Sequence, residues 1–383
     1  MIYFDNNATT HLAPAVIEAM NAALQSYGNP SSAHAIGQAS RKIIDDARES
    51  VADLLGARPA EIVFTSGGTE GDNWAIAGAL DSQPERKHII TTSVEHEAVR
   101  KLCEKLETRG YDVTWLGVDE TGSLDLDELR SALTERTAIV SIMMANNETG
   151  VVFPVAEAAA IVKENSNALF HVDGVNAAGK IPIDLKNTQI DLLSISAHKF
   201  HGPKGIGALY IREGLSLPSL FIGGGQESGR RAGTEAVHQI AGLGAAAKLV
   251  KDMTEMERIR GMRDRLETAI LETIPNAFLN GTRDASKRLP NTSNISFENT
   301  NGEMILAALD DAGVCVSTGS ACNDQNHQAS AVLQAMNVPY SRAMGSIRFS
   351  LGRFNNADEV DAVLNTLPNI IENLRALAAE PRA

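Results

Sequence analysis

Short apolar segments typical of β-strands alternate with helical segments over the first two-thirds of the chain. Strands are predicted at residues 61–65, 88–92, 137–143, 169–172, 191–196 and 206–211. Helices are predicted between them at residues 70–80, 96–108 and 155–164. This alternation predicts an α/β fold in which helices cover both faces of a mainly parallel sheet. Ligands of such sheets bind at the carboxyl ends of the strands, so polar residues at those ends are candidates for a site.

The pattern changes after residue 234. A tract without Pro at 236–273 is predicted to be helical and to lead into a smaller C-terminal domain. The elements predicted there are strands at 292–297 and 346–351 and helices at 303–311 and 358–377. A chain of 383 residues is long enough for two domains with a substantial core.

Charge and cysteine content exclude several classes of protein. The net charge of −14 argues against a general nucleic-acid binder, because a phosphate backbone would be repelled. No basic segment followed by an apolar one suggests a secretory signal, and no apolar run approaches the length of a membrane span. The three cysteines match neither a disulfide framework nor a Cys-x-x-Cys metal site. We therefore expect a cytoplasmic protein with reduced thiols.

Lys199 follows a predicted strand and lies among Ser, His and Gly residues, and Asp173 ends another strand with a carboxylate. A lysine amine can form a Schiff base with a carbonyl cofactor, and pyridoxal phosphate also needs an acid that keeps its ring nitrogen protonated. A lysine at a strand end is more often a surface residue. The paired Asp173 and the glycine-containing segments described next favour a pyridoxal phosphate site instead.

Two glycine-containing segments are candidates for binding a phosphate group. In the segment 62–70, a strand is followed by a Gly67-Gly68 turn and a helix start, whose free amides and Thr69 hydroxyl could bind phosphate. The segment does not fit the dinucleotide fingerprint Gly-x-Gly-x-x-Gly, and a plain capped turn is the alternative. The segment 223–234 is rich in Gly and Arg; it could bind phosphate or form a flexible surface loop.

His96 and the pair Asn146-Asn147 follow two further strands. The His96 imidazole could stack on a planar cofactor or move a proton, and the alternative is that it only begins a helix. The two amides could form hydrogen bonds to a ligand, although Asn and Gly are also common in plain turns.

A cysteine and an arginine in the C-terminal third complete the candidates. Cys322 lies among small and polar residues, which predicts a thiol that solvent can reach. Cys103 lies in a predicted helix and Cys315 between two valines, so both are expected to be structural. Arg348 lies within a predicted strand, where a buried guanidinium needs an anion; a substrate carboxylate would fit its planar fork.

Together these residues resemble the cysteine desulfurases of the NifS/IscS type, among the class V aminotransferase-like pyridoxal phosphate enzymes. The resemblance covers nearly the whole chain and rests on the segments 3–10, 28–32, 65–70, 146–148, 196–199, 231–234, 319–322 and 347–350. It implies fold type I of the pyridoxal phosphate transferases, with a mainly parallel seven-stranded sheet in a large domain and a smaller α+β C-terminal domain. The implied division is an N-terminal arm (1–12) that joins the small domain, a large cofactor-binding domain (13–250) and a small domain (251–383) with the cysteine loop.

The resemblance also implies a role for each candidate residue. Lys199, Cys322 and His96 are expected to be catalytic: Lys199 holds the cofactor, His96 stacks on its ring and Cys322 accepts the sulfur. The residues expected to bind the rest of the cofactor are Asp173 at the ring nitrogen, Asn147, and Gly68, Thr69, Ser196 and His198 at the phosphate, with Thr234 of the partner subunit in a homodimer. Arg348, together with Asn147, is expected to bind the substrate. No metal site is expected, apart from transient ligation of an iron–sulfur cluster by Cys322.

Two positions depart from the family pattern. The family usually has Gln three residues after the Asp, bonded to the ring hydroxyl; here Asn176 is one methylene shorter, so a water is expected to bridge. The segment after the cysteine also differs, and reads Asn-Asp-Gln-Asn-His-Gln-Ala-Ser at 323–330. Because Asp324 disfavours the thiolate of Cys322, we expect His96 to accept the thiol proton.

The implied reaction removes sulfur from L-cysteine and gives L-alanine and a persulfide on Cys322. An acceptor protein then takes the sulfur, either an iron–sulfur scaffold or a tRNA-thiolation protein. Two alternatives stay open: a selenocysteine lyase or related pyridoxal lyase on the same fold, and a sulfur-relay scaffold with a degenerate site. No nucleic-acid or membrane partner is expected.

Overall fold

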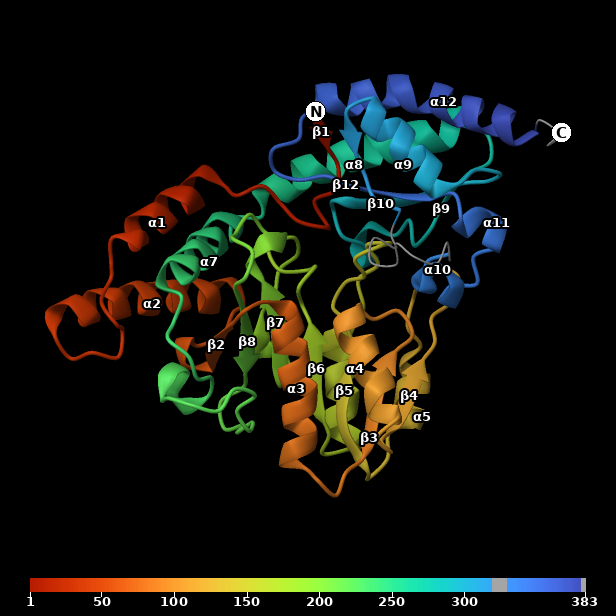
Figure 1. Ribbon diagram of the computed structural model, residues 1–383. Helices are drawn as coiled ribbons and strands as arrows, with labels where there is room; N and C mark the ends of the chain where they lie inside the picture. Colours follow the sequence, from red (N-terminus) through yellow and green to blue (C-terminus); the bar gives the residue numbers. More distant parts are fainter. Residues whose placement is uncertain (319–328, 380–383) are drawn as a thin grey trace.

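The structure is a computed structural model that describes residues 1–318 and 329–379. A seven-stranded sheet in the order β2-β8-β7-β6-β5-β3-β4 forms its centre (Figure 1). The strands are β2 (Ile62–Thr65), β3 (His88–Thr92), β4 (Asp112–Leu116), β5 (Thr137–Ser141), β6 (Leu169–Asp173), β7 (Leu192–Ser196) and β8 (Gly207–Ile211). The five strands from β7 to β4 are parallel, and β8 is antiparallel to both of its neighbours. The predicted mainly parallel sheet is therefore confirmed.

Helices cover both faces of this sheet, as the strand sequences require. Consecutive residues of a strand point to opposite faces, and both faces are apolar: Ile89 packs in the cluster that contains α3 and α4, and Ile90 packs in the cluster on the other face. The helices of this part are α1 (Pro14–Leu24), α2 (Ala35–Leu54), α3 (Gly68–Ser82), α4 (Glu97–Glu107), α5 (Leu126–Ala132), α6 (Val155–Asn165) and α7 (Val237–Val250). The second cluster includes residues of α1, α2, α6 and α7.

The helix predicted at 236–273 is two helices. α7 ends at Val250 and α8 (Thr254–Thr273) follows after three residues. Asp252 lies between them, and its Oδ1 accepts a hydrogen bond from the backbone N–H of Thr254 at 2.9 Å. This bond satisfies one of the unpaired amides at the start of α8.

The C-terminal part has a second, antiparallel sheet in the order β12-β10-β9. Its elements are β9 (Ala277–Leu279), β10 (Thr292–Phe297), α9 (Gly302–Asp311), β11 (Val314–Cys315), α10 (Ala331–Ala335), α11 (Tyr340–Ala343), β12 (Ser346–Ser350) and α12 (Ala357–Ala379). The first residues of the chain join this part, because β1 (Ile2–Tyr3) pairs in parallel with β11 and Phe4 packs in its separate core (Figure 1). The domain boundaries at residues 12 and 250 stay predictions.

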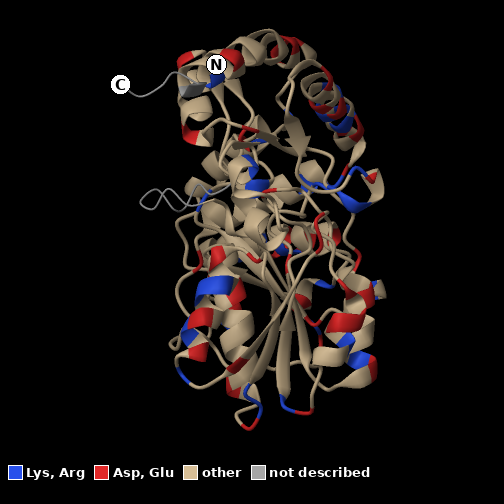
Figure 2. Ribbon diagram, turned by 90° about the vertical axis from the view of Figure 1, so that its right-hand side faces the viewer, with Lys and Arg blue, Asp and Glu red and all other residues tan. Residues whose placement is uncertain are grey.

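Charged residues of both signs are interspersed over the outer helices, whereas the strands of the large sheet carry few of them (Figure 2). Within residues 1–318 and 329–379, no helix combines the length and the apolar character needed to cross a membrane.

Candidate functional site

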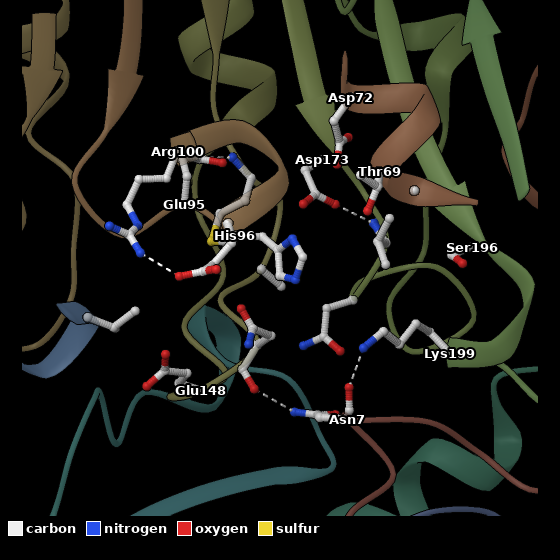
Figure 3. A pocket seen from close by; sticks show the side chains of 18 of the residues that line it. Asn7, Thr69, Asp72, Glu95, His96, Arg100, Glu148, Asp173, Ser196 and Lys199 are labelled. Carbon is white, nitrogen blue, oxygen red and sulfur yellow. Dashed lines mark hydrogen bonds and ion pairs between the residues drawn. The ribbon is translucent and has the colours of Figure 1, made fainter. Parts of the chain in front are cut away.

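A cavity of about 360 Å³ lies where the carboxyl ends of the parallel strands meet the N-terminal segment and the C-terminal part (Figure 3). The predicted site residues that line it are Gly68, Thr69, His96, Asn147, Asp173, Asn176, Ser196, His198, Lys199 and Arg348. Thr234 does not line it and is exposed. Cys322 lies outside the described residues.

Asp173 is the last residue of β6 and is buried beside the cavity. Its Oδ1 accepts a hydrogen bond from the backbone N–H of Val175 at 2.9 Å. Burial, together with the neighbouring carboxyl of Asp72, raises the pKa of Asp173 to about 6, while His96 acts in the opposite direction. A buried carboxylate of this kind is stabilised by a cationic partner, such as a protonated ring nitrogen.

Lys199 lies in the single turn Ala197–Lys199 that follows β7. Its Nζ donates hydrogen bonds to the backbone oxygen of Asn7 at 2.5 Å and to that of Ala8 at 3.1 Å. Figure 3 shows Lys199, His96 and Asp173 around the same space, with Asn7 at the end of the lysine side chain. The strand end thus brings the amine to the cavity, and the N-terminal segment holds it there.

His96 caps α4, and its Nδ1 accepts a hydrogen bond from the backbone N–H of Ala98 at 3.1 Å. Burial lowers the pKa of His96, and the charge of Lys199 lowers it further, although Asp173 opposes this. The ring is therefore neutral, and because Nδ1 accepts, its proton is on Nε2. His96 presents a donor to the cavity. The expectation that His96 accepts the proton of the Cys322 thiol stays a prediction.

The expected phosphate end of the site is formed by the start of α3 and the turn after β7. α3 begins at Gly68, whose position is closely packed: a Cβ atom there would lie 2.4 Å from Cγ2 of Val175. The free amides of the first turn suit an anion. On the other side, burial lowers the pKa of His198 to about 4, and its Nδ1 lies 3.2 Å from Oγ1 of Thr9. His198 is therefore neutral and can donate one hydrogen bond.

Arg348 lies in β12, and its side chain is 3% exposed. One guanidinium nitrogen pairs with Oδ1 of Asp5 at 2.7 Å, and the other donates to the backbone oxygen of Asn147 at 3.0 Å. These contacts fix the planar fork at the edge of the cavity.

Asn176 lines the cavity, and its Oδ1 accepts a hydrogen bond from Nζ of Lys180 at 2.6 Å. Its Nδ2 is 3.5 Å from the backbone oxygen of Asn146, at the limit of a hydrogen bond. Lys180, which does not line the cavity, therefore holds the Asn176 side chain, and the sequence had not suggested this contact.

The cavity also includes polar residues to which the sequence analysis assigned no role, among them Asn7, Asp72, Glu95 and Glu148. Burial raises the pKa of Asp72 and of Glu148 to about 7, and that of Glu95 well above its usual value. Asp72 lies three residues after Thr69, one helical turn further along α3. That spacing, on a helix whose first turn was a candidate anion site, was the available signal.

The segment that carries Cys322 is joined to the described residues next to the cavity. On one side, Ser317 forms a β-bridge with Arg348. On the other side, the Ser330 hydroxyl donates to Glu148, and Ala331 and Val332 line the cavity.

The other two cysteines are free thiols in the expected structural settings. Cys103 is fully buried in α4, and burial raises its pKa to about 12; Cys315 lies in β11, and burial also raises its pKa. In the ranges that the structure describes, no three His, Cys, Asp or Glu side chains are grouped to hold a metal ion.

Comparison with known proteins places this site in a family. The sequence matches the family Aminotransferase class-V over residues 2–363. A cysteine desulfurase of Nostoc sp. is 54% identical over 381 residues, which are 99% of this chain and 94% of that protein. A solved NifS-like protein has a TM-score of 0.90 at 38% identity, over 97% of this chain and 100% of that one. A solved structure described as SspA in complex with cysteine has a TM-score of 0.82 at 35% identity, over 93% and 100% of the two chains.

These similarities cover almost the whole chain and confirm the family that the sequence motifs suggested. The fold also agrees, because the parallel sheet and the C-terminal part superpose on NifS-like structures. The chain belongs to the class-V aminotransferase family and, within it, to the cysteine desulfurases of the NifS type.

Proposed function

We propose that this protein is a pyridoxal phosphate-dependent cysteine desulfurase. It takes sulfur from L-cysteine, releases L-alanine and keeps the sulfur as a persulfide on Cys322. The observation that carries the proposal is that Lys199, Asp173 and His96, which follow three different strands, line one cavity together with Arg348. Members of this family generally depend on pyridoxal phosphate, and the relatives named above support the activity.

The cavity fits this cofactor in three respects. Asp173 is a buried carboxyl with a raised pKa, which a protonated ring nitrogen would stabilise. The first turn of α3 begins at the closely packed Gly68 and supplies free amides for a phosphate. Within the described part of the chain, two buried polar atoms of the lining, Asp72 Oδ1 and Glu95 Oε2, have no hydrogen-bond partner, as expected where a polar ligand belongs. Nε2 of the His171 side chain lies 3.5 Å from Asp72 Oδ1.

When bound, pyridoxal phosphate supplies an electron sink for the electron pair left at the substrate Cα. Lys199 would hold the cofactor through its amine, and the free amine would accept the Cα proton of the substrate. Asp173 keeps the ring nitrogen protonated. His96 covers the ring and offers its Nε2–H as a donor. Arg348 would bind the substrate carboxylate.

The sulfur step needs no external oxidant or reductant. The Cys322 thiolate attacks the substrate sulfur, an S–S bond forms, and the Cβ–S bond breaks with its electrons going to the carbon. A proton taken up at that carbon completes L-alanine. An acceptor protein then takes the sulfur from Cys322.

A homodimer is part of the proposal. Thr234 is exposed and away from the cavity, as expected of a residue that serves the site of a partner subunit. Leu220, Phe221 and Ile222 are exposed apolar residues of the preceding segment, and a subunit contact would bury them. We also keep the cytoplasmic location as a prediction from the reduced thiols.

The test is an absorption spectrum of the purified protein, with and without L-cysteine, together with an assay of L-alanine. The wild-type protein should show the long-wavelength band of a lysine-bound pyridoxal cofactor, and L-cysteine should change it. Lys199→Ala should lose both the band and the release of L-alanine. Lys204→Ala is the matched control, because Lys204 is exposed in the next turn and does not line the cavity. Survival of the band in Lys199→Ala would refute the assignment.

The same assay separates the alternative activities. A selenocysteine lyase would act on selenocysteine but not on L-cysteine, and a sulfur-relay scaffold would form L-alanine from neither substrate.

A further inference from the structure

Lys180 is a buried lysine to which the family resemblance assigns no task. It is 7% exposed, and it lies four residues after Asn176, in the segment that follows β6. Its Nζ donates to Oδ1 of Asn176 at 2.6 Å and to Oδ1 of Asn7 at 3.1 Å. A lysine is rarely buried to this degree, because desolvation of its charge is costly.

The contact with Lys180 fixes which way the Asn176 amide is turned. Nζ of Lys180 donates to Oδ1 of Asn176, and as an ammonium it can only donate, so the oxygen of the amide faces the lysine. The amide nitrogen then lies on the other side of the side chain. Among the described residues, this nitrogen donates only to the backbone oxygen of Asn146 at 3.5 Å, which leaves donor capacity for the cavity that Asn176 lines.

Lys180 holds Asn7 in the same way. Oδ1 of Asn7 accepts from Lys180 and from Nδ2 of Asn291 at 3.1 Å, so its Nδ2 is the group that donates to the backbone oxygen of Asn147 at 3.1 Å. The backbone oxygen of Asn7 accepts the hydrogen bond of Lys199. Two lysines therefore contact the same asparagine, one at its side chain and one at its backbone.

The electrostatic setting agrees with this packing. Burial lowers the pKa of Lys180 well below its usual value, and the nearby charges of Lys199 and Arg348 lower it further. Burying the Lys180 amine costs free energy of folding, and an apolar side chain of similar size would avoid this cost.

We propose that Lys180 is a positioning residue that turns the N–H group of Asn176 toward the ring oxygen of the cofactor and holds Asn7 against Lys199. The proposal rests on the proposed function, because it takes the ligand to be a ring with an anionic oxygen. Lys180 itself touches neither the cofactor nor the substrate. It acts through two amides whose orientation its donor groups decide, and it offsets the shorter reach of Asn176.

The test measures the dissociation constant of pyridoxal 5′-phosphate by equilibrium dialysis of the full-length protein. Lys180→Met keeps the length of the side chain and removes the donor. Lys180→Met and Asn176→Ala should each weaken cofactor binding by about 3- to 10-fold, the equivalent of one hydrogen bond. Both changes remove the Lys180–Asn176 contact, whereas only Lys180→Met removes the contact with Asn7. The factor by which Lys180→Met weakens binding should therefore be smaller in the Asn176→Ala background than in the wild-type protein. Unchanged binding in Lys180→Met, or effects that multiply, would overturn the proposal.

Lys163→Met is the matched control. Lys163 is another partly buried lysine, which donates to the backbone oxygen of Ala168 and pairs with Asp191, and it does not line the cavity. Its loss should lower the melting temperature and leave cofactor binding unchanged. An equal loss of binding in Lys163→Met would assign the effect of Lys180 to general stability and overturn the positioning role.

If Lys180→Met does not fold, Asn176→Asp tests whether the N–H group of Asn176 contributes to cofactor binding. An Asp at this position still accepts from Lys180 but offers no N–H group to the cavity. It should weaken cofactor binding by at least about 10-fold without lowering the melting temperature, and wild-type affinity would overturn the proposal. Failure of the wild-type protein to bind pyridoxal phosphate at all would contradict the proposed function instead.

Discussion

Nζ of Lys199 lies 2.5 Å from the backbone oxygen of Asn7, a residue 192 positions earlier in the chain. The N-terminal segment that carries Asn7 also pairs with β11 of the C-terminal part. Lys199, which is proposed to hold the cofactor, therefore contacts the N-terminal segment, and Phe4 of that segment packs in the core of the C-terminal part. The position of Lys199 depends on the packing of both parts of the molecule.

Asp173→Ala should keep part of the cofactor and lose most of the activity. The phosphate end of the site stays intact, but without the carboxylate the ring nitrogen loses its proton and the electron sink fails. We expect the rate of L-alanine formation to fall by about 100-fold or more, which is the usual effect of removing one preorganised polar group from an active site. The measurements are cofactor content from the absorption spectrum and the initial rate of L-alanine release. Near-normal turnover would count against the site.

Asp72→Asn should stabilise the cofactor-free protein at alkaline pH. Burial raises the pKa of Asp72 to about 7, above its ordinary value of 3.8, so folding is penalised where the carboxyl is ionised and the penalty fades as the pH falls from 7 to 4. The gain in the free energy of unfolding should be about 2–4 kcal/mol near pH 8 and less than half of that near pH 5.

Urea unfolding at the two pH values measures this difference. Asp81→Asn is the control, because Asp81 is exposed near the end of the same helix and should give no gain at either pH. A gain for Asp72→Asn that is larger at the acidic pH would contradict the argument.

Most strands of the large sheet could be predicted from the sequence, because they depend on local patterns, whereas the roles of the site residues stay predictions. An apolar run that ends in a polar residue, such as Asp173 or Ser196, identifies both the strand and its carboxyl end. β4 was missed because Asp112–Leu116 is partly exposed at the edge of the sheet and lacks a continuous apolar run.

Contacts between residues far apart in the chain could not be predicted in this way. Lys180 lies in a polar segment, and only the folded structure brings Asn7 to it. The donor role of His96 depends on its hydrogen bond with the backbone of Ala98, which no sequence motif specifies.

Asn176→Gln should be tolerated and should tighten the cofactor. The longer side chain regains the reach of the usual family residue and can form one neutral hydrogen bond, worth about 0.5–1.5 kcal/mol. The gain requires that the amide oxygen still accepts from Lys180, as Oδ1 of Asn176 does at 2.6 Å. Equilibrium dialysis of the cofactor checks it. A clear loss of affinity would show that the pocket is shaped around the shorter residue.

Arg348→Lys should raise the KM for L-cysteine more than it lowers kcat. A lysine keeps the charge but cannot contact Asp5, Asn147 and a carboxylate with one planar group. We expect a rise in KM of about 10-fold, which corresponds to about 1.4 kcal/mol of lost binding. Arg342→Lys is the control, because Arg342 stacks on Phe278 and does not line the cavity. An unchanged KM for Arg348→Lys would mean that another group binds the carboxylate.

Cys322→Ser should bind L-cysteine, change the cofactor spectrum and yet form no enzyme persulfide and little L-alanine. The hydroxyl of Ser is not a nucleophile toward sulfur at neutral pH, whereas a thiolate is. Cys103→Ser and Cys315→Ser should remain active, because Cys103 is buried, Cys315 lies in β11, and neither residue lines the cavity. Persulfide is measured by alkylation and mass spectrometry. If Cys322→Ser still releases selenium from selenocysteine but fails on cysteine, the lyase alternative gains. Wild-type release of L-alanine from L-cysteine by this variant would show that the persulfide mechanism is wrong.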